Sequence, residues 1–273
     1  MTDRRRLDVE LAERGLAPSR ARAQALIIAG KVTVDGRVVT KAGSPVKEDV
    51  AIEIAEPDHP YASRGALKLE AALDAFAIDP AGCDCLDVGA STGGFTDLML
   101  VRGAARVIAL DVGRGQLDWR LRTDDRVTVI EGVNARHLGP DDLPFSVGLA
   151  TIDVSFISLR LVVPALLPHL DPGAHLVCLV KPQFEAGRNQ VGKGGIVRDE
   201  GVRRRVVDDT VAAIADLGFE LVGVIPSPIK GQKGNQEAVS YTHLTLPTNT
   251  NAGRGRGGPG ACEGGGGGGG GGG

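Results

Sequence analysis

The segment CLDVGASTGGF, residues 85–95, constrains the fold of this chain more than any other stretch of the sequence. It begins as an apolar run typical of a β-strand, breaks into small residues and glycine, and then resumes as a helix. Ligands of open α/β sheets bind beyond the carboxyl ends of the strands, where such tight turns stand. The segment therefore predicts an α/β fold that holds a nucleotide-like ligand at this turn.

The sequence on both sides of this turn alternates between strand-like and helix-like segments. The apolar, strand-like segments are 83–90, 105–113, 126–132, 146–156, 174–182 and 219–228. The helix-like segments are 94–103, 158–170 and 200–218. Near-continuous apolar strands that alternate with helices predict a Rossmann-like, doubly wound parallel sheet covered on both faces.

The first 55 residues have the pattern of a small, separate α+β module. Leu7, Leu11 and Leu16 mark a short amphipathic helix, and Ser19 is placed to cap a second helix that ends at Gly30. The segment KVTVDGRVV then reads as two strands around Asp35-Gly36, a dipeptide that favours a type I′ turn. Two short helices followed by a hairpin resemble the S4-like RNA-binding module first described in a small-subunit ribosomal protein.

The charge of the chain is unevenly distributed. The whole chain carries a formal charge of −3, whereas residues 1–50 hold ten Lys or Arg and seven Asp or Glu, a local excess of +3. A basic appendage on an acidic body suggests that the appendage meets a polyanion; the alternative is a solvated surface with a chance imbalance of charge. The basic residues expected to contact RNA are Arg4, Arg5, Arg6, Arg20, Arg22 and Lys31.

Two further segments set the domain limits. Residues 56–65 contain two prolines and are expected to be a linker, and the closing glycine homopolymer is expected to be disordered. The peptide VSYTHLTLPT resembles one that recurs where sequencing-adaptor DNA has been translated, so we expect the natural carboxyl terminus to be missing. The predicted division is an RNA-binding domain at 1–55, the linker at 56–65, a catalytic domain at 66–241, and a non-native, Gly-rich tail at 242–273.

The turn at Gly89 does not match the common phosphate-binding patterns. A nicotinamide fingerprint requires glycine at the third position, where this chain has Ser91, and a P-loop requires a Gly-Lys-Ser/Thr run that is absent here. An uncharged turn suits a ligand without a pyrophosphate, and S-adenosylmethionine is such a ligand. The turn therefore favours S-adenosylmethionine.

The expected contacts to this donor follow from strand positions. An acid near the end of the first strand can pair with the ammonium group of the donor, and glycines let the backbone approach closely. Asp111 ends the second strand, where an acid accepts both ribose hydroxyls, and Asn134 follows the third strand, where it meets the adenine edge. The predicted donor-binding residues are Asp87, Gly89, Ser91, Gly93, Gly94, Asp111 and Asn134.

Four charged residues stand where buried strands meet this crevice. Lys68 lies on a helix before the first strand, and Asp153, Lys181 and Glu237 follow later strands or strand-like segments. Burying a charged group without a partner costs on the order of several kcal/mol. We therefore expect the two lysines to pair with the two carboxylates. The simpler interpretation is a pair of strand-end salt bridges.

Six motifs of the chain resemble the TlyA-type (hemolysin A family) ribosomal RNA methyltransferases, which join an RNA-binding module to an FtsJ/RrmJ-like methyltransferase domain. They are LDVGASTGGFTD, ALDVGRGQL, TIDVSFISL, LVKPQFEAG, GKGGIVRD and SPIKGQKGNQE. The resemblance implies S-adenosylmethionine-dependent 2′-O-methylation of cytidine ribose in ribosomal RNA, free or within ribosomal subunits. It also implies a catalytic tetrad at Lys68, Asp153, Lys181 and Glu237. The family continues with an apolar final strand where this chain has its tail, which puts the support of Glu237 in question.

The chemistry assigns a role to each member of the tetrad. A ribose hydroxyl must lose its proton as it attacks the methyl carbon of the donor. A lysine accepts that proton only in its neutral form, and burial and a second cation favour the neutral form. Lys181 is the expected base, with Lys68 as the second cation, Asp153 orienting Lys181, and Glu237 steering Lys68 or the ribose. The donor is already activated, so no metal is expected.

Two other functions fit parts of the sequence. A catalytically impaired RNA-binding protein would follow if the altered carboxyl end disables the tetrad. A membrane-active hemolysin is suggested only by the family name, and the sequence has neither a signal peptide nor an apolar stretch of about 18 residues. We therefore expect a cytoplasmic protein that does not bind membranes.

Overall fold

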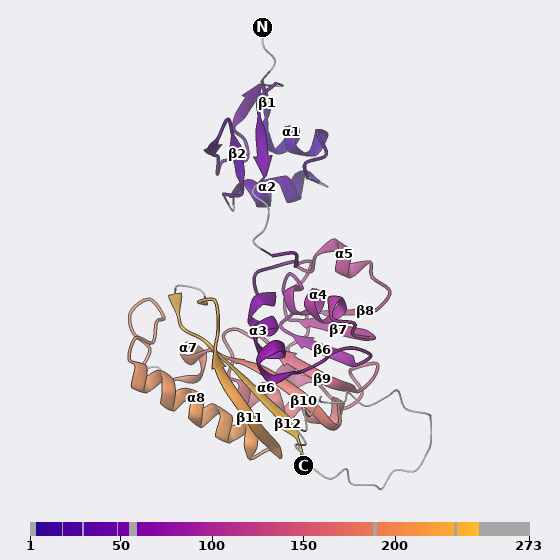
Figure 1. Cartoon of the computed structure of the whole chain (residues 1–273), viewed down its shortest axis with the longest axis vertical. Helices are drawn as coiled ribbons and strands as arrows, with labels where there is room; N and C mark the ends of the chain where they lie inside the picture. Colours follow the sequence, from indigo (N-terminus) through magenta and orange to yellow (C-terminus); the bar gives the residue numbers. More distant parts are fainter. Residues whose placement is uncertain are drawn as a thin grey trace, which may run out of the picture. The chain divides into compact units, whose positions relative to one another are not determined.

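The computed structural model describes residues 4–17, 19–28, 30–47, 49–54, 59–187, 190–231 and 234–245. The chain forms two compact units, Met1–Pro60 and Tyr61–Gly273, whose boundary falls inside the segment 56–65 (Figure 1). Of the expected linker, residues 56–58 lie outside the described residues. Each unit has its own apolar core.

The amino-terminal unit packs two helices against two small sheets. Its helices are α1 (Leu7–Glu13) and α2 (Arg20–Ile28). Strand β1 (Arg4–Arg6) pairs with β4 (Pro45–Lys47), and β2 (Val32–Val34) pairs with both β3 (Arg37–Val38) and β5 (Ile52–Ile54). The pairs are antiparallel, and the core between helices and sheets includes Leu7, Leu11, Ala23, Ile27, Val32 and Val46.

The structure confirms most of the turn and capping predictions for this unit. Asp35 and Gly36 both have positive φ angles, 48° and 72°, as a type I′ turn requires. The Ser19 hydroxyl accepts the backbone N–H of Arg22 and caps α2. The inclusion of Leu16 in the first helix was wrong, because α1 ends at Glu13 and the Leu16 side chain is exposed.

The second unit is built on a seven-stranded sheet. Its strands are β6 (Asp84–Val88), β7 (Arg106–Asp111), β8 (Val127–Glu131), β9 (Val147–Ile152), β10 (Leu170–Val180), β11 (Phe219–Pro226) and β12 (Ala238–Leu244). Their order across the sheet is β11-β12-β10-β9-β6-β7-β8. The helices are α3 (Ala66–Phe76), α4 (Gly94–Val101), α5 (Trp119–Arg122), α6 (Leu159–Leu166), α7 (Pro182–Glu185) and α8 (Glu200–Ala215), with 3₁₀ turns η1 (Ala135–His137) and η2 (Leu167–His169).

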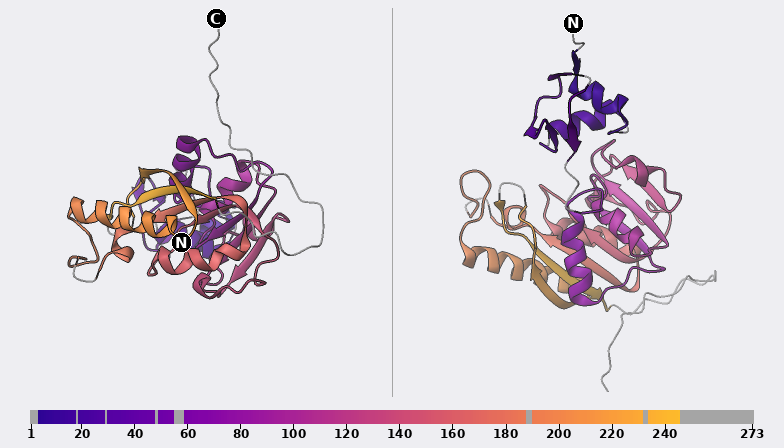
Figure 2. Two further views of the ribbon diagram at one scale, coloured as in Figure 1. Left: turned by 90° about the horizontal axis from the view of Figure 1, so that it is seen from below. Right: turned by 45° about the horizontal axis from the view of Figure 1, so that its top comes forward.

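Helices cover both faces of this sheet. Neighbouring strand residues point to opposite faces, so Cys85 packs with α3 and α4, whereas Leu86 packs with α6 and α8. Figure 2 shows from two further directions that α8 lies beside the edge strand β11, with which it is in contact. The two apolar layers hold the sheet between them and leave the carboxyl ends of β6, β7, β9 and β10 for the site.

The sheet departs from the predicted parallel arrangement at one strand, β12. This strand runs antiparallel to both of its neighbours, β10 and β11, and fills the place between them. The tail boundary at 242 is wrong for the same reason, because Thr242, His243 and Leu244 belong to β12, and Leu244 is buried against the core. The segment alternates small or polar residues with Val239 and Tyr241, and pairing on both edges satisfies its backbone groups. The rest of the expected tail, 246–273, lies outside the described residues.

Among the described helices, none combines the length and the apolar character that a membrane span requires.

Candidate active site

The tertiary structure brings the four charged residues together at the carboxyl edge of the sheet. Lys68 projects from α3, Asp153 follows β9, Lys181 follows β10, and Glu237 directly precedes β12. Lys68 Nζ lies 2.7 Å from Glu237 Oε2 and 3.8 Å from Asp153 Oδ2, and Lys181 Nζ lies 2.5 Å from Asp153 Oδ1. Asp153 thus joins the two lysines, and the four side chains form one connected cluster.

Three of these four residues are almost inaccessible to water. Lys68 is 8% exposed, Lys181 is 7% exposed and Glu237 is 3% exposed. Charged groups are buried to this extent only where partners compensate for lost hydration. Since Lys68 and Glu237 are 169 positions apart in the sequence, only the folded sheet supplies those partners.

A tight loop holds the Glu237 carboxylate in place. The Glu237 carbonyl accepts the N–H of Ser227, and the Asn235 side chain accepts the N–H of Val197 and donates to the carbonyl of Gly195. A Cβ atom at Gly231 would lie 1.9 Å from Glu237 Oε1, so only glycine leaves room for the carboxylate. The motif SPIKGQKGNQE is therefore the support of one tetrad residue, and it is tied to the motif GKGGIVRD.

Ser155 is a site residue that the sequence analysis missed. Lys181 Nζ donates a hydrogen bond to Ser155 Oγ at 3.0 Å. Its contact with Asp153 Oδ1 is an ion pair that does not have hydrogen-bond geometry. Ser155 stands two positions after Asp153 in the motif TIDVSFISL, and this spacing along the chain was the available signal. Ser155 lines the neighbouring cavity.

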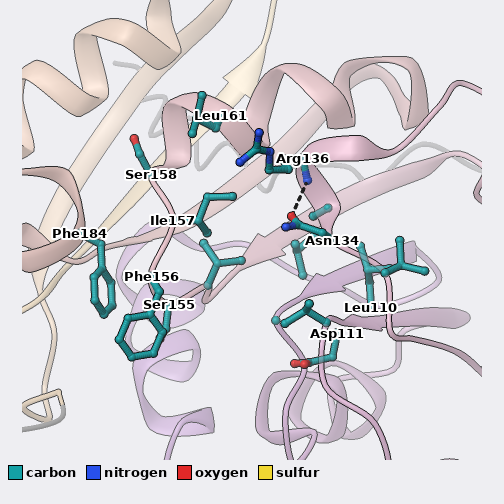
Figure 3. A pocket seen from close by; sticks show the side chains of 16 residues that line it. Leu110, Asp111, Asn134, Arg136, Ser155, Phe156, Ile157, Ser158, Leu161 and Phe184 are labelled. Carbon is teal, nitrogen blue, oxygen red and sulfur yellow. Dashed lines mark hydrogen bonds between the residues drawn. The ribbon is translucent and has the colours of Figure 1, made fainter.

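A cavity of about 510 Å³ opens beside the cluster. Asp111 and Asn134 lie on one side of it, and Ser155, Phe156 and Phe184 lie on the other (Figure 3). Gly89 and Val154 also line it. A second cavity of about 130 Å³ is lined by a smaller set that includes Asp87, Gly89, Ser91, Gly94 and Asp153. Gly89 lines both cavities, so the glycine turn and the charged cluster share one crevice.

Gly89 is needed where two strand ends meet. Its φ is +87°, and a Cβ atom there would lie 2.7 Å from the carbonyl oxygen of Asp153. The residue therefore allows the end of β6 to approach the segment that carries Asp153.

The Asp111 carboxylate organises the turn that it faces. One oxygen accepts the N–H of Ser91 at 2.8 Å, and the other accepts the N–H of Gly113 at 2.6 Å. Carboxylate oxygens have further lone pairs, so Asp111 retains acceptor capacity at the cavity wall. Asn134 Oδ1 accepts the N–H of Arg136 at 3.2 Å, the bond drawn in Figure 3.

Asp87 is held differently from Asp111. It is fully buried and accepts both the N–H and the hydroxyl of Thr96, at 2.9 and 2.7 Å. Burial raises the pKa of Asp87 to about 7; the Thr96 hydrogen bonds oppose this shift, and the negative charges of Asp153 and Asp111 add to it. Asp87 lines the smaller cavity and at the same time anchors the start of α4.

The two remaining glycines of the turn are in packing contacts. A Cβ atom at Gly93 would lie 2.3 Å from the side chain of Leu121, and one at Gly94 would lie 2.4 Å from Ser63 Oγ. Gly94 lines the smaller cavity, and Gly93 lines neither of these two cavities. The absence of a side chain at Gly93 leaves room for Leu121.

The six basic residues expected to contact RNA all lie in the amino-terminal unit. Arg4, Arg5, Arg6, Arg20 and Arg22 are exposed, and Lys31 is half-buried. Arg5 pairs with Glu13, and Arg6 and Arg20 both pair with Asp8. Three of the six are therefore bound to carboxylates of α1.

Comparison with known protein families identifies both units. A model of the FtsJ-like methyltransferase family matches residues 61–243, and a model of the S4 domain matches residues 5–52. The first match covers the seven-stranded unit, and the second covers the helix–hairpin unit.

Individual relatives cover most of the chain. The 16S/23S rRNA (cytidine-2′-O)-methyltransferase TlyA of Mycobacterium tuberculosis is 50% identical over 87% of this chain and 89% of its own length. Hemolysin A of Brachyspira hyodysenteriae is 42% identical over 86% of this chain and 98% of its own length. A protein of Streptococcus thermophilus whose solved structure carries a hemolysin name is 42% identical, covers 90% of each chain and has a TM-score of 0.70.

Proposed function

Since the chain belongs to the TlyA family of ribosomal RNA methyltransferases, we propose that it methylates the 2′-hydroxyl of a cytidine ribose in ribosomal RNA, with S-adenosylmethionine as donor. The observation that supports this most is the joining of Lys68, Asp153, Lys181 and Glu237 beside a cavity that starts at Gly89. The M. tuberculosis relative, named for this reaction on 16S and 23S rRNA, supports the choice of substrate.

The larger cavity fits the donor in size and in lining. Its volume of about 510 Å³ lies in the range of small-molecule sites, which is about 300–1,000 Å³. We assign Asp111 to the ribose hydroxyls, Asn134 to the adenine edge, and Asp87 with the turn at Gly89 and Ser91 to the amino-acid portion. When bound there, the donor supplies an activated methyl group for transfer to the ribose oxygen.

Lys181 is assigned as the base because of how its nitrogen is surrounded. A neutral lysine amine has two hydrogens and one lone pair around Nζ. Ser155 Oγ accepts one of these hydrogens at 3.0 Å, and Asp153 Oδ1 forms an ion pair with Nζ at 2.5 Å. The two contacts hold the nitrogen in place, and we assign its lone pair to the proton of the ribose hydroxyl. After it has accepted this proton, the ammonium group is stabilised by the charge of Asp153.

Lys68 and Glu237 hold Asp153 in position on its other side. Lys68 Nζ bridges Glu237 Oε2 and Asp153 Oδ2, so Asp153 is fixed between two amines. A carboxylate fixed in this way holds Lys181 at one point, which is the positional precision that transfer between two bound groups requires.

Phe156 is assigned to the target base. Phe156 is 85% exposed and lines the cavity, its backbone has a φ of +64°, and its ring centre lies 4.9 Å from that of Phe184. A non-glycine residue with positive φ is strained, and such strain is maintained where the side chain has a task. An exposed ring offers a stacking surface for an unstacked base, as is usual in recognition of single-stranded RNA.

The amino-terminal S4 unit supplies the contact to the RNA backbone, through Arg4, Arg5, Arg6, Arg20, Arg22 and Lys31. Phosphate contacts position an enzyme on RNA without reading its sequence. A substrate of ribosomal RNA or ribosomal subunits places the reaction in the cytoplasm.

The test is methyl transfer from tritium-labelled S-adenosylmethionine to purified 16S and 23S rRNA and to isolated ribosomal subunits, followed by mass-spectrometric mapping. We expect one or more cytidines to gain a ribose methyl group. RNA binding without transfer would favour the alternative of a catalytically impaired RNA-binding protein, and transfer to a base rather than a ribose would overturn the proposal.

A further inference from the structure

The amino-terminal unit contains a buried carboxylate that binds two of its exposed arginines. Asp8 is the second residue of α1, and its side chain is 0% exposed. Arg6 donates to it through Nε and Nη2 at 3.0 and 3.1 Å, and Arg20 donates through Nε at 3.0 Å. Gln24 adds a fourth hydrogen bond, at 2.6 Å. One carboxylate thus connects β1, α1 and α2.

The two arginines reach from this buried point into solvent. The Arg6 side chain is 52% exposed and the Arg20 side chain is 54% exposed. Within the described part of the amino-terminal unit, no hydrogen bond occupies Nη1 or Nη2 of Arg20. Arg6 lies against Gly43, where a Cβ atom would stand 2.9 Å from Nη1. Asp8 therefore holds each guanidinium by one edge, while about half of each arginine side chain stays exposed.

The cluster keeps a positive charge that a simple salt bridge would not keep. Two guanidinium groups share one carboxylate, so the net charge of the three side chains is +1. The hydrogen bond from Arg6 is the main cause that lowers the pKa of Asp8 far below its usual range; burial opposes this shift, and Gln24 and Arg20 add to it. The carboxylate is therefore ionised at neutral pH, where it binds both guanidinium groups.

A fixed pair of guanidinium groups suits a phosphate diester. The planar guanidinium presents its N–H groups as a fork that matches phosphate oxygens, and fixing the fork before binding reduces the loss of side-chain entropy. We propose that Asp8 is a positioning residue that holds Arg6 and Arg20 as one preorganised site for the phosphate backbone of ribosomal RNA. The proposal rests on the proposed function, because that function supplies the RNA.

This role and a purely electrostatic one predict effects of opposite sign. If Arg6 and Arg20 attract RNA only by charge, removal of the negative charge at Asp8 strengthens binding. If Asp8 positions the two arginines, the same change weakens binding. The sign of the change in affinity therefore separates the two explanations.

The experiment measures binding of the full chain to purified 16S and 23S rRNA at several salt concentrations. We expect Asp8→Asn to raise Kd about fivefold to tenfold and to make the slope of log K against log salt shallower by about one. Asp49→Asn is the matched control, since Asp49 is an exposed carboxylate of the same unit, and it should leave Kd unchanged or slightly lower. Equal or tighter binding by Asp8→Asn overturns the proposal.

A second variant guards against loss of folding. Arg20→Lys keeps the charge on an exposed side chain but lacks the fork, so we expect it to weaken binding as well, and wild-type affinity in this variant overturns the proposal. In methyl-transfer assays the loss should appear in KM for rRNA rather than in kcat. If the wild-type chain itself does not bind rRNA, the proposed function fails, and this result is distinguishable from a wild-type chain that binds while Asp8→Asn has no effect.

Discussion

The two units of this protein build charged clusters in opposite ways. In the amino-terminal unit, one buried carboxylate, Asp8, lies between two half-exposed guanidinium groups. In the catalytic unit, the buried amines of Lys68 and Lys181 lie on either side of Asp153, and the buried Glu237 closes the cluster. The first cluster turns its cations outward, and the second encloses them.

The difference follows from what each cation can do. A guanidinium group stays protonated in proteins, so an exposed arginine can only bind, and it binds best when its direction is fixed. A lysine amine can lose its proton, so a lysine that is shielded from water and held by fixed acceptors can act as a base. The same attraction between opposite charges therefore serves binding in one unit and, as we propose, proton transfer in the other.

The largest effect on methyl transfer is expected when the titratable amine of Lys181 is replaced. Lys181→Arg retains the positive charge but replaces the titratable amine with a group that stays protonated, and Lys181→Ala removes the amine altogether. Both changes should lower kcat for methyl transfer by at least about 10³-fold, within the range of a lost general base. Isothermal titration with S-adenosylmethionine should show intact donor binding in both. Turnover retained by either variant contradicts the assignment of Lys181 as base.

A second prediction compares two aspartates that are equally buried. Asp8 is bound to two arginines and its pKa is lowered, whereas Asp87 forms no ion pair within the described part of the chain and its pKa is raised to about 7. The folded catalytic unit therefore holds a proton on Asp87 that the unfolded chain releases near pH 4. The stability that this proton gives is fully present below about pH 4 and is lost as the pH rises toward 7.

Asp87→Asn removes this titration. The free energy of unfolding of the wild type, measured by urea denaturation, should fall relative to that of the variant by up to about 4 kcal/mol between pH 4 and pH 7. The free energy of unfolding of the wild type relative to that of Asp8→Asn should show the opposite trend, since the Asp8 carboxylate stabilises the fold above about pH 4 and this effect is lost as the pH falls. Parallel pH profiles for wild type and Asp87→Asn would show that burial does not shift the titration of Asp87.

The smallest effect tests how firmly the catalytic cluster must be held. Gly231→Ala places a methyl group in the space of the Glu237 carboxylate, which must then move away from Lys68. Displacements of about 1 Å cost about 10²-fold in rate, so we expect kcat to fall about 10- to 100-fold. Gly139→Ala is the matched control, because its Cβ would meet only ordinary contacts and its φ is not positive. Equal rates for the two variants would show that the cluster tolerates movement of Glu237.

Much of the fold was predictable because its signals are local. The hairpin at Asp35-Gly36 depends on a dipeptide, and the strands from β6 to β11 depend on short apolar runs that carry their own preference. β12 was missed because its residues, taken alone, resemble a tail, and the strand forms only because β10 and β11 leave a place between them that satisfies both of its edges.

The residues of the candidate site likewise divide into those that local sequence signals indicate and those that only the tertiary structure reveals. The strand ends indicated Asp153 and Lys181, because a charge directly after a buried apolar strand needs a partner. Lys68, on a helix, and Glu237, after a strand-like segment, were joined to them as the charges that could supply partners. Asp8 gave no such signal, since an acid in a helix is common in any sequence, and the only signal for Ser155 was its spacing of two positions after Asp153. Only the tertiary structure shows that Ser155 contacts Lys181 and that Asp8 contacts Arg6 and Arg20.

The sequence alone determined the sheet-forming runs, the tight turns and the positions where charge meets a buried strand, because these depend on neighbours along the chain. The tertiary structure alone decided the pairing of each charge, the room at Gly231 and the direction of the two exposed arginines. Those properties depend on atoms that are up to 169 positions apart in sequence and meet only when the sheet and its helices are packed.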